Sequence, residues 1–84
     1  MIKITKIELL DNYLIHFFFD DDTDKVIDLN NFIKPGTFNE ELKNREYFEQ
    51  VKIYDNGRGI HWPNGYDLCP DTLRYYTETV KEDA

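Results

Sequence analysis

The residues most capable of chemistry in this chain are a histidine, an aspartate and the single cysteine, which lie close together at His61, Asp67 and Cys69. A cysteine hydrolase needs an activated thiolate with a base nearby, and these residue types supply both groups. Cys69 directly precedes Pro70, where a helix is expected to begin, and that position can lower the pKa of a thiol. The three residues therefore define one hypothesis, a small cysteine-dependent enzyme.

Each of these residues also has a structural explanation. Cys69 is then a small, half-buried side chain, and His61 is a strand residue. Asp67 follows a tight turn and precedes a helix start, where its carboxylate accepts hydrogen bonds from loop N–H groups and holds Trp62 in register. We favour these structural roles, so no catalytic residue is predicted and the enzyme remains the alternative.

Carboxylates are concentrated in one loop, at Asp20, Asp21, Asp22 and Asp24. Three of them have the 1, 3, 5 spacing of a calcium-binding loop, which requires glycine at the next position and a bidentate glutamate at the twelfth. This chain has Lys25 and Asn31 there, so no metal and no other cofactor is predicted. We expect a solvated hairpin turn whose charge also suits docking of a basic protein surface.

The 84-residue chain is strongly acidic, with 17 Asp and Glu against 10 Lys and Arg and a net charge of −7. Nucleic-acid binding draws most of its affinity from cations that neutralise phosphates, so direct nucleic-acid binding is not expected. One cysteine excludes an internal disulfide and fits a reducing compartment, and no apolar stretch approaches the roughly 20 residues of a membrane span. We therefore expect a cytoplasmic protein, without membrane contact, whose partner is another protein with a basic surface.

Alternation of apolar and polar residues predicts three strands in the first third of the chain. Tyr13–Asp20 gives the clearest alternation. The parity of the apolar residues changes within Ile2–Leu10, which predicts a β-bulge near Lys6. Lys25–Leu29 then completes an antiparallel meander over residues 2–29.

Helical and hairpin signals alternate in the rest of the chain. Residues 38–50 have helical character, as one helix or two short ones. An Asn-Gly pair between apolar stretches predicts a hairpin over 51–62. A helix-starting proline and the apolar spacing after it predict a helix over 70–80. The sequence therefore predicts a single α+β domain over 1–84: a small, mainly antiparallel sheet, made of the meander and the later hairpin, with helices packed on one face.

Three aromatic residues of the 61–76 segment bear on binding, because Tyr and Trp are enriched at protein interfaces. Trp62 is expected mainly in the core, with an exposed ring edge available to a partner. Tyr66 and Tyr75 are expected to be surface residues. Together with the acidic loop they complete the predicted partner-binding set: Asp20, Asp21, Asp22, Asp24, Trp62, Tyr66 and Tyr75.

The segment from Trp62 to Leu73 reads Trp-Pro-x-Gly-x-Asp-Leu-x-Pro-Asp-x-Leu. Together with the strand that carries Tyr13, a third strand that ends in Asp-Leu and the apolar positions of 38–50, this pattern resembles the family of small bacterial domains catalogued as domain-of-unknown-function 2442. The resemblance covers nearly the whole chain. It implies a compact α+β fold of short strands and helices, and it brings no agreed enzymatic activity with it.

The same resemblance implies a context for the function. Some members carry a helix-turn-helix domain after the signature, and members are often encoded beside another small protein, an arrangement similar to toxin–antitoxin pairs. The chain departs from the family in the acidic loop, where the family favours Asp-Gly. We expect a non-catalytic protein-binding module, antitoxin-like or a mobile-element inhibitor of nucleic-acid-binding machinery such as an anti-CRISPR. The alternatives are the cysteine-dependent enzyme and an accessory domain of a DNA-binding regulator, and monomer and homodimer both stay open.

Overall fold

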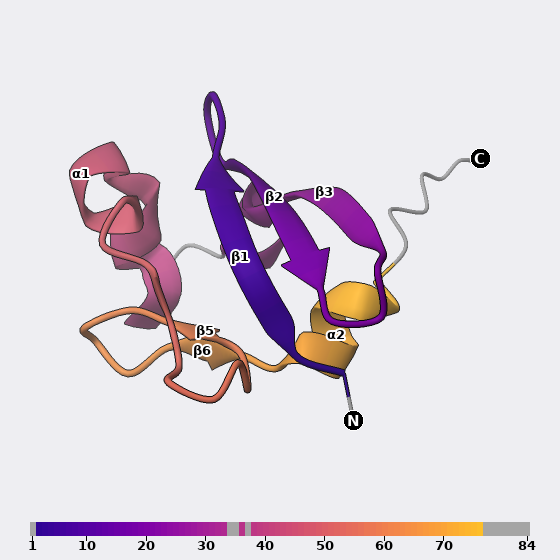
Figure 1. Ribbon diagram of the computed structural model, residues 1–84. Coiled ribbons are helices and arrows are strands. Elements are labelled where there is room, and N and C mark those ends of the chain that lie inside the picture. The colour runs from indigo at the N-terminus through magenta and orange to yellow at the C-terminus, as the bar shows by residue number, and fades with distance from the viewer. Residues whose placement is uncertain (1, 34–35, 37, 77–84) are drawn as a thin grey trace.

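Two antiparallel three-stranded sheets and several short helices make up the computed structural model, which describes residues 2–33, 36 and 38–76 (Figure 1). The first sheet has the order β1-β2-β3 and the second the order β4-β5-β6. The strands are β1 (Ile4–Leu9), β2 (Leu14–Phe19), β3 (Asp24–Asp28), β4 (Lys52–Ile53), β5 (Ile60–His61) and β6 (Asp67–Leu68). The helices are η1 (Leu29–Phe32), η2 (Phe38–Lys43), α1 (Arg45–Phe48) and α2 (Pro70–Arg74).

The first sheet follows the alternation in the sequence. In β2, Ile15 and Phe17 are fully buried, whereas His16 and Phe18, which alternate with them, are only half-buried. Successive strand side chains point to opposite faces, so one face of this sheet lies on the core and the other is only partly covered.

The predicted bulge in β1 is present, because the register between β1 and β2 shifts between Ile4 and Lys6. Before this shift Ile4 lies opposite Phe19, and after it Ile7 lies opposite Phe17. An extra residue in one strand reverses the facing of those beyond it. The bulge therefore places both isoleucines against the core despite their odd spacing.

The second sheet contains strands of only two residues each. The predicted hairpin joins β4 to β5, and the turn between them packs on β1, where the N–H of Ile4 donates to the carbonyl of Gly57 at 2.9 Å. The third strand, β6, was not predicted, although Leu68 pairs with Ile60. Two residues between a turn and a helix carry no strand periodicity, so only the tertiary pairing reveals this strand.

The helices are short and lie near opposite ends of the first sheet, with α1 near the β1–β2 turn and α2 near the β2–β3 turn (Figure 1). The segment 38–50 forms two helices, η2 and α1. The α2 helix ends at Arg74, earlier than the predicted end, and residues 77–80 of that prediction lie outside the described residues. Within the described chain, no helix is long and apolar enough to cross a membrane.

A lysine from the first sheet binds the end of α2. The ammonium of Lys25 donates to the carbonyls of Leu73 at 3.3 Å and Arg74 at 2.8 Å, and also to that of Tyr76. A cation is stabilising at the negative end of a helix, where the last carbonyls have no helical partner. Burial, more than the neighbouring Arg74, lowers the pKa of Lys25.

Both sheets and the helical segments supply the hydrophobic core. Its largest fully buried side chains are Trp62, Phe17, Phe48, Ile15, Ile27, Leu29, Leu42, Ile60 and Leu73. The core therefore runs from the first sheet into the 61–76 segment, which contributes Trp62, Leu68 and Leu73 to it.

Candidate functional site

The acidic loop is a tight turn in which most carboxylates already have partners. Asp20 accepts the backbone N–H of Lys3 at 3.0 Å. Asp21 accepts the backbone N–H and the hydroxyl of Thr23, and the Nε of Arg74 at 3.0 Å. The hydrogen bond from the Thr23 hydroxyl, followed by that from Arg74, holds the pKa of Asp21 below its ordinary value. Two of the predicted binding residues therefore also brace the turn.

The remaining carboxylates of the turn differ from each other. Asp22 has a positive φ of 68° and is exposed, and no contact is recorded for its side chain within the described residues. Asp24 lies at the start of β3 and contacts the His16 ring, with Oδ2 2.6 Å from Nε2. Among residues 2–33, 36 and 38–76, no three His, Cys, Asp or Glu side chains are placed to hold a metal ion.

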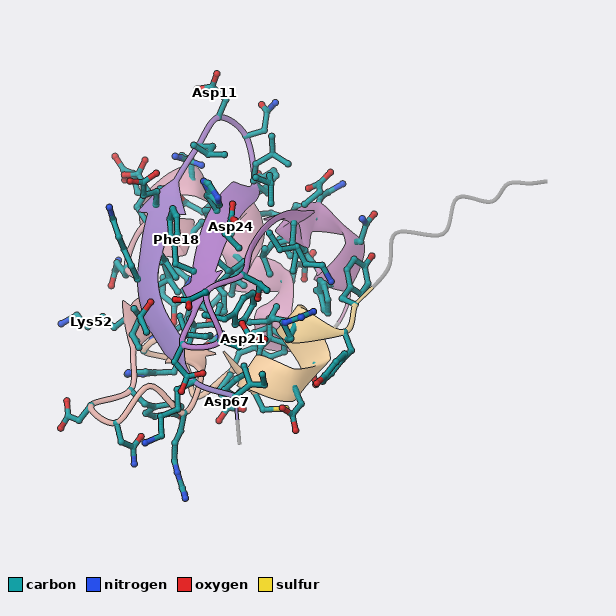
Figure 2. The ribbon with its side chains drawn as sticks, turned by 45° about the vertical axis from the view of Figure 1, so that its right-hand side comes forward. Asp11, Phe18, Asp21, Asp24, Lys52 and Asp67 are labelled. Carbon is teal, nitrogen blue, oxygen red and sulfur yellow. The ribbon has the colours of Figure 1, made fainter. Side chains whose placement is uncertain are left out.

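The partly covered face of the first sheet adjoins this turn. We call it the outer face and define it by Lys6, Glu8, His16, Phe18, Asp24 and Val26. Cross-strand pairs place these residues together: Lys6 lies opposite Phe18, and His16 lies between Glu8 and Val26. Figure 2 shows Phe18 and Asp24 over the sheet, with Asp21 on the turn beneath them.

The side chain of His16 lies at the centre of the outer face. Its Nδ1 lies 3.9 Å from Glu8, its Nε2 contacts Asp24, and its ring packs on Phe18 with centroids 4.2 Å apart. Lys6 extends over the same Phe18 ring, with its Nζ 5.3 Å from the ring centroid and 3.0 Å from the Glu8 carboxylate. These contacts fix the orientation of the aromatic and acidic groups on an otherwise open surface.

An aliphatic side chain is exposed beside this charged cluster. Val26 keeps 50% of its surface in water, and it is one of the few large apolar side chains that do so in the described chain. The outer face therefore combines an exposed apolar side chain with fixed carboxylates. The sequence indicated this face only through the partly apolar residues that alternate with the buried ones in β2.

Trp62 lies in the core, and the predicted exposed ring edge is absent. The side chain is 1% exposed, and its Nε1 donates to the carbonyl of Phe48 at 3.0 Å. Burial of a tryptophan requires a partner for its N–H, and the end of α1 supplies one. Trp62 therefore offers no surface to a partner, because the small core needs the whole ring.

The two tyrosines of the predicted binding set have different environments. Tyr66 is half-buried, and its ring lies 5.7 Å from that of Trp62. Tyr75 is 66% exposed and lies beside the acidic turn, because Arg74 contacts both Asp21 and the Tyr75 ring. The structure therefore brings Tyr75 together with the acidic turn and places Tyr66 against the core.

His61 and Asp67 are neighbours on the exposed face of the second sheet. They are cross-strand partners, and Lys52 lies opposite His61 on its other side. Tyr54 stacks on His61 with centroids 4.2 Å apart and donates its hydroxyl to Asp67 at 3.0 Å, a bond that raises the pKa of Tyr54. Sequence reasoning missed Tyr54, because its contacts depend on the unpredicted strand β6.

The sequence predicted that Asp67 accepts hydrogen bonds from loop N–H groups. In the structure its carboxylate accepts the hydroxyl of Tyr54 instead. The Tyr54–His61 stack lies between two shallow hollows. One has about 420 Å³ and is lined by Tyr54, Asp55, Asn56 and Arg58, and the other has about 380 Å³ and is lined by Gln50, Lys52, His61 and Pro63.

Cys69 is exposed and makes its contacts with residues outside the Tyr54–His61 stack. Its Sγ is 3.0 Å from the hydroxyl of Thr72, and this hydrogen bond lowers the pKa of the thiol. Within the described residues, no contact joins Cys69 to His61, whose ring packs on Tyr54 instead. The three candidates for catalysis therefore divide into a His61–Asp67 pair and a separate thiol.

Comparison with known proteins gives a family and no closer relative. A family model with the description "Protein of unknown function (DUF2442)" matches residues 4–79. No curated protein and no solved structure matches the chain. The match includes both sheets, the acidic turn and the 61–76 segment, so it covers nearly all of the 84 residues. The chain belongs to the DUF2442 family.

Proposed function

We propose that this chain is a non-catalytic protein-binding module that inhibits or regulates a partner protein with a basic surface. The partner docks on the outer face of the first sheet and on the adjoining acidic turn. The observation that carries this proposal is the half-exposed Val26 beside the fixed carboxylates Glu8 and Asp24. An apolar centre with charged surroundings provides both burial and orientation for a partner.

The asymmetry of the first sheet supports this location. We propose that the helices and the second sheet pack on its Ile15–Phe17 face alone, which leaves the outer face available. Tyr75 is the third part of the surface, since Arg74 connects it to Asp21. An antitoxin-like role in the cytoplasm fits a small acidic module that occupies a basic surface of its partner.

A charge reversal on the outer face tests the proposal. A partner is first captured from the native host by the immobilised wild-type chain, purified, and titrated calorimetrically against the wild type and two variants. Asp24→Lys places a cation on the outer face, whereas Asp11→Lys makes the same charge change on the β1–β2 turn at the far end of the sheet (Figure 2). We expect Asp24→Lys to weaken binding by about tenfold or more, because like charges meet, and Asp11→Lys to change it little.

Two results would contradict the proposal: no specific partner, or equal affinities for the two variants. Melting curves of both variants show whether each is folded before its affinity is interpreted.

The alternative function, a small cysteine-dependent enzyme, rests on the exposed Cys69 with its lowered pKa. The rate of alkylation by iodoacetamide at neutral pH tests this alternative. A thiolate activated for catalysis reacts much faster than a cysteine peptide, and Thr72→Val then slows the reaction because it removes the hydroxyl that lowers the pKa. A rate equal to that of the peptide argues against the enzyme.

A further inference from the structure

The two edges of the first sheet differ in their coverage. The β1 edge is closed at one end by the β4–β5 turn, since Ile4 donates to the carbonyl of Gly57. β3 forms the other edge, and Figure 1 shows no described strand beyond it. An uncovered edge strand presents backbone N–H and C=O groups that can pair with a strand from another chain.

The register between β2 and β3 shows which backbone N–H and C=O groups of β3 point away from β2. Phe19 donates to the carbonyl of Thr23, and Leu29 donates to that of Tyr13, at opposite ends of the β2–β3 ladder. Hydrogen-bonded and non-hydrogen-bonded pairs alternate along an antiparallel ladder. Asp24, Val26 and Asp28 are therefore in the non-hydrogen-bonded pairs and direct their backbone groups away from β2.

Outside the β2–β3 ladder, the backbone N–H and C=O groups of Val26 and Asp24 make no hydrogen bond within residues 2–33, 36 and 38–76. The side chains of the same three residues belong to the partly covered side of the sheet, where Val26 is half exposed and Asp24 has 57% of its side-chain surface in water. The short strand β3 therefore combines outward-facing backbone groups with the exposed side chain of Val26, which has an aspartate two residues away on either side.

We propose that β3 pairs with an extended, basic segment of the partner, which adds a fourth, antiparallel strand to the first sheet. This inference rests on the proposed function and specifies how its partner binds. The added strand has an aliphatic residue opposite Val26 and cations two residues away on either side, opposite Asp24 and Asp28. Antiparallel pairing extends the pattern of the existing sheet, and opposite charges directly across a strand pair stabilise it.

The same residues exclude a second copy of this chain as the occupant. Antiparallel self-pairing centred on Val26 places Asp24 of one copy opposite Asp28 of the other. Like charges directly opposite each other destabilise a strand pair. The two aspartates thus protect the edge from self-association while they select a basic strand.

A synthetic peptide tests this pairing on the folded wild-type chain. The probe is an acetylated and amidated peptide, Thr-Arg-Thr-Val-Thr-Arg-Thr, which has the expected basic and aliphatic positions on one face. We expect saturable changes in the backbone amide resonances of Asp24–Asp28, with little change at Asp11. N-methylation of the central Val removes the donor that faces Val26 and should weaken binding by about tenfold, the effect of one lost hydrogen bond.

Matched controls separate backbone pairing from charge attraction. N-methylation of the Thr after the Val removes an amide that points away from β3, so affinity should stay within about twofold. The chain variant Asp24→Asn with Asp28→Asn should weaken binding about fivefold, whereas Asp11→Asn should not.

Three results would overturn the inference: no binding at millimolar peptide, resonance changes away from β3, or equal loss with both N-methylated peptides. The proposed function is tested separately. A captured partner that binds wild type and Val26→Pro equally refutes strand addition and leaves the binding module intact, because proline removes the outward-facing N–H at this position and keeps an apolar side chain there. Failure to capture any specific partner refutes the proposed function itself.

Discussion

The covered and uncovered parts of the first sheet are built from different side chains. Its core face contains Ile15, Phe17 and Ile27, all essentially without exposed surface, and the turn at Gly57 closes the end of its β1 edge. Its outer face contains a histidine held between two acids, and its β3 edge has an exposed valine between aspartates. One half of the sheet therefore provides stability, and the other half carries the surface that we propose for a partner.

This division has a consequence for mutagenesis. In a chain of 84 residues the core is small, so changes on the covered side should reduce the free energy of unfolding strongly. Changes on the uncovered side should leave most of that free energy intact and act on binding instead. Neighbouring residues in one strand can test this contrast.

The largest expected effect comes from the adjacent pair Phe17 and Phe18. Phe17→Ala should reduce the free energy of unfolding by about 3–5 kcal/mol, because it leaves a cavity in the core. Phe18→Ala should cost about 1 kcal/mol or less, since its half-buried ring contacts mainly His16 and Lys6. Urea denaturation measures both values, and similar costs for the two variants would remove the distinction between the faces.

The second prediction concerns the β1 edge of the first sheet, where the β4–β5 turn packs on Ile4. Gly57 has a φ of +75°, and an added Cβ would lie 2.8 Å from the backbone oxygen of Ile4. Gly57→Ala should therefore reduce stability by about 3 kcal/mol, because strain and a backbone clash act together. Gly65→Ala is the matched control: φ is +93° and nothing lies within 4 Å of the added Cβ.

Gly65→Ala should reduce the free energy of unfolding by about 1 kcal/mol, because it adds only conformational strain. Thermal unfolding of both variants gives the comparison. If Gly65→Ala is as destabilising as Gly57→Ala, contact between the β4–β5 turn and β1 contributes little to stability.

The sequence was informative wherever a repeating pattern determined the structure. Alternation in Tyr13–Asp20 predicted β2 and its two faces, and the change of parity near Lys6 predicted the bulge in β1. The α+β class and the antiparallel pairing follow from the same signals. These features depend on side chains close together in the chain, which explains why they could be predicted.

Features that depend on contacts between distant residues could not be predicted in this way. β6 exists because Asp67 and Leu68 pair with β5, and its two residues have no periodicity of their own. The α2 helix ends near a lysine that is almost 50 residues earlier in the chain. The β3 edge, which no other described strand covers, likewise depends on what packs beside it, and composition alone indicates only that the surface is acidic.

The third prediction tests the lysine that connects the first sheet to α2. Lys25→Met should reduce the free energy of unfolding by about 1–2 kcal/mol, because carbonyls at the helix end lose a charged donor. Lys52→Met is the control, since Lys52 is exposed and its ammonium makes no hydrogen bond or ion pair within the described residues. Its cost should stay within about 0.5 kcal/mol. Equal values from urea denaturation would show that the carbonyl contacts of Lys25 are not stabilising.

The smallest expected effect is a pH dependence in the acidic turn. The hydrogen bond from Thr23 and the contact with Arg74 lower the pKa of Asp21 in the folded chain. The folded state then binds fewer protons than the unfolded state in the acid range, so Asp21 contributes stability at neutral pH that is lost as pH falls through its folded pKa. Asp21→Asn should therefore lower the melting temperature at neutral pH, and the difference from wild type should shrink below about pH 4.

Asp22→Asn makes the same charge change one residue away in the same turn. Asp22 has no recorded side-chain partner within the described residues, and asparagine tolerates its positive φ, so this variant should melt close to wild type at every pH. Melting curves recorded between about pH 2 and about pH 7 compare the three proteins. If the two variants show the same pH profile, the effect belongs to the net charge of the turn. If only Asp21→Asn changes the loss of stability in acid, the Asp21 carboxylate secures α2 through Arg74, and the exposed Asp22 is not needed for that contact.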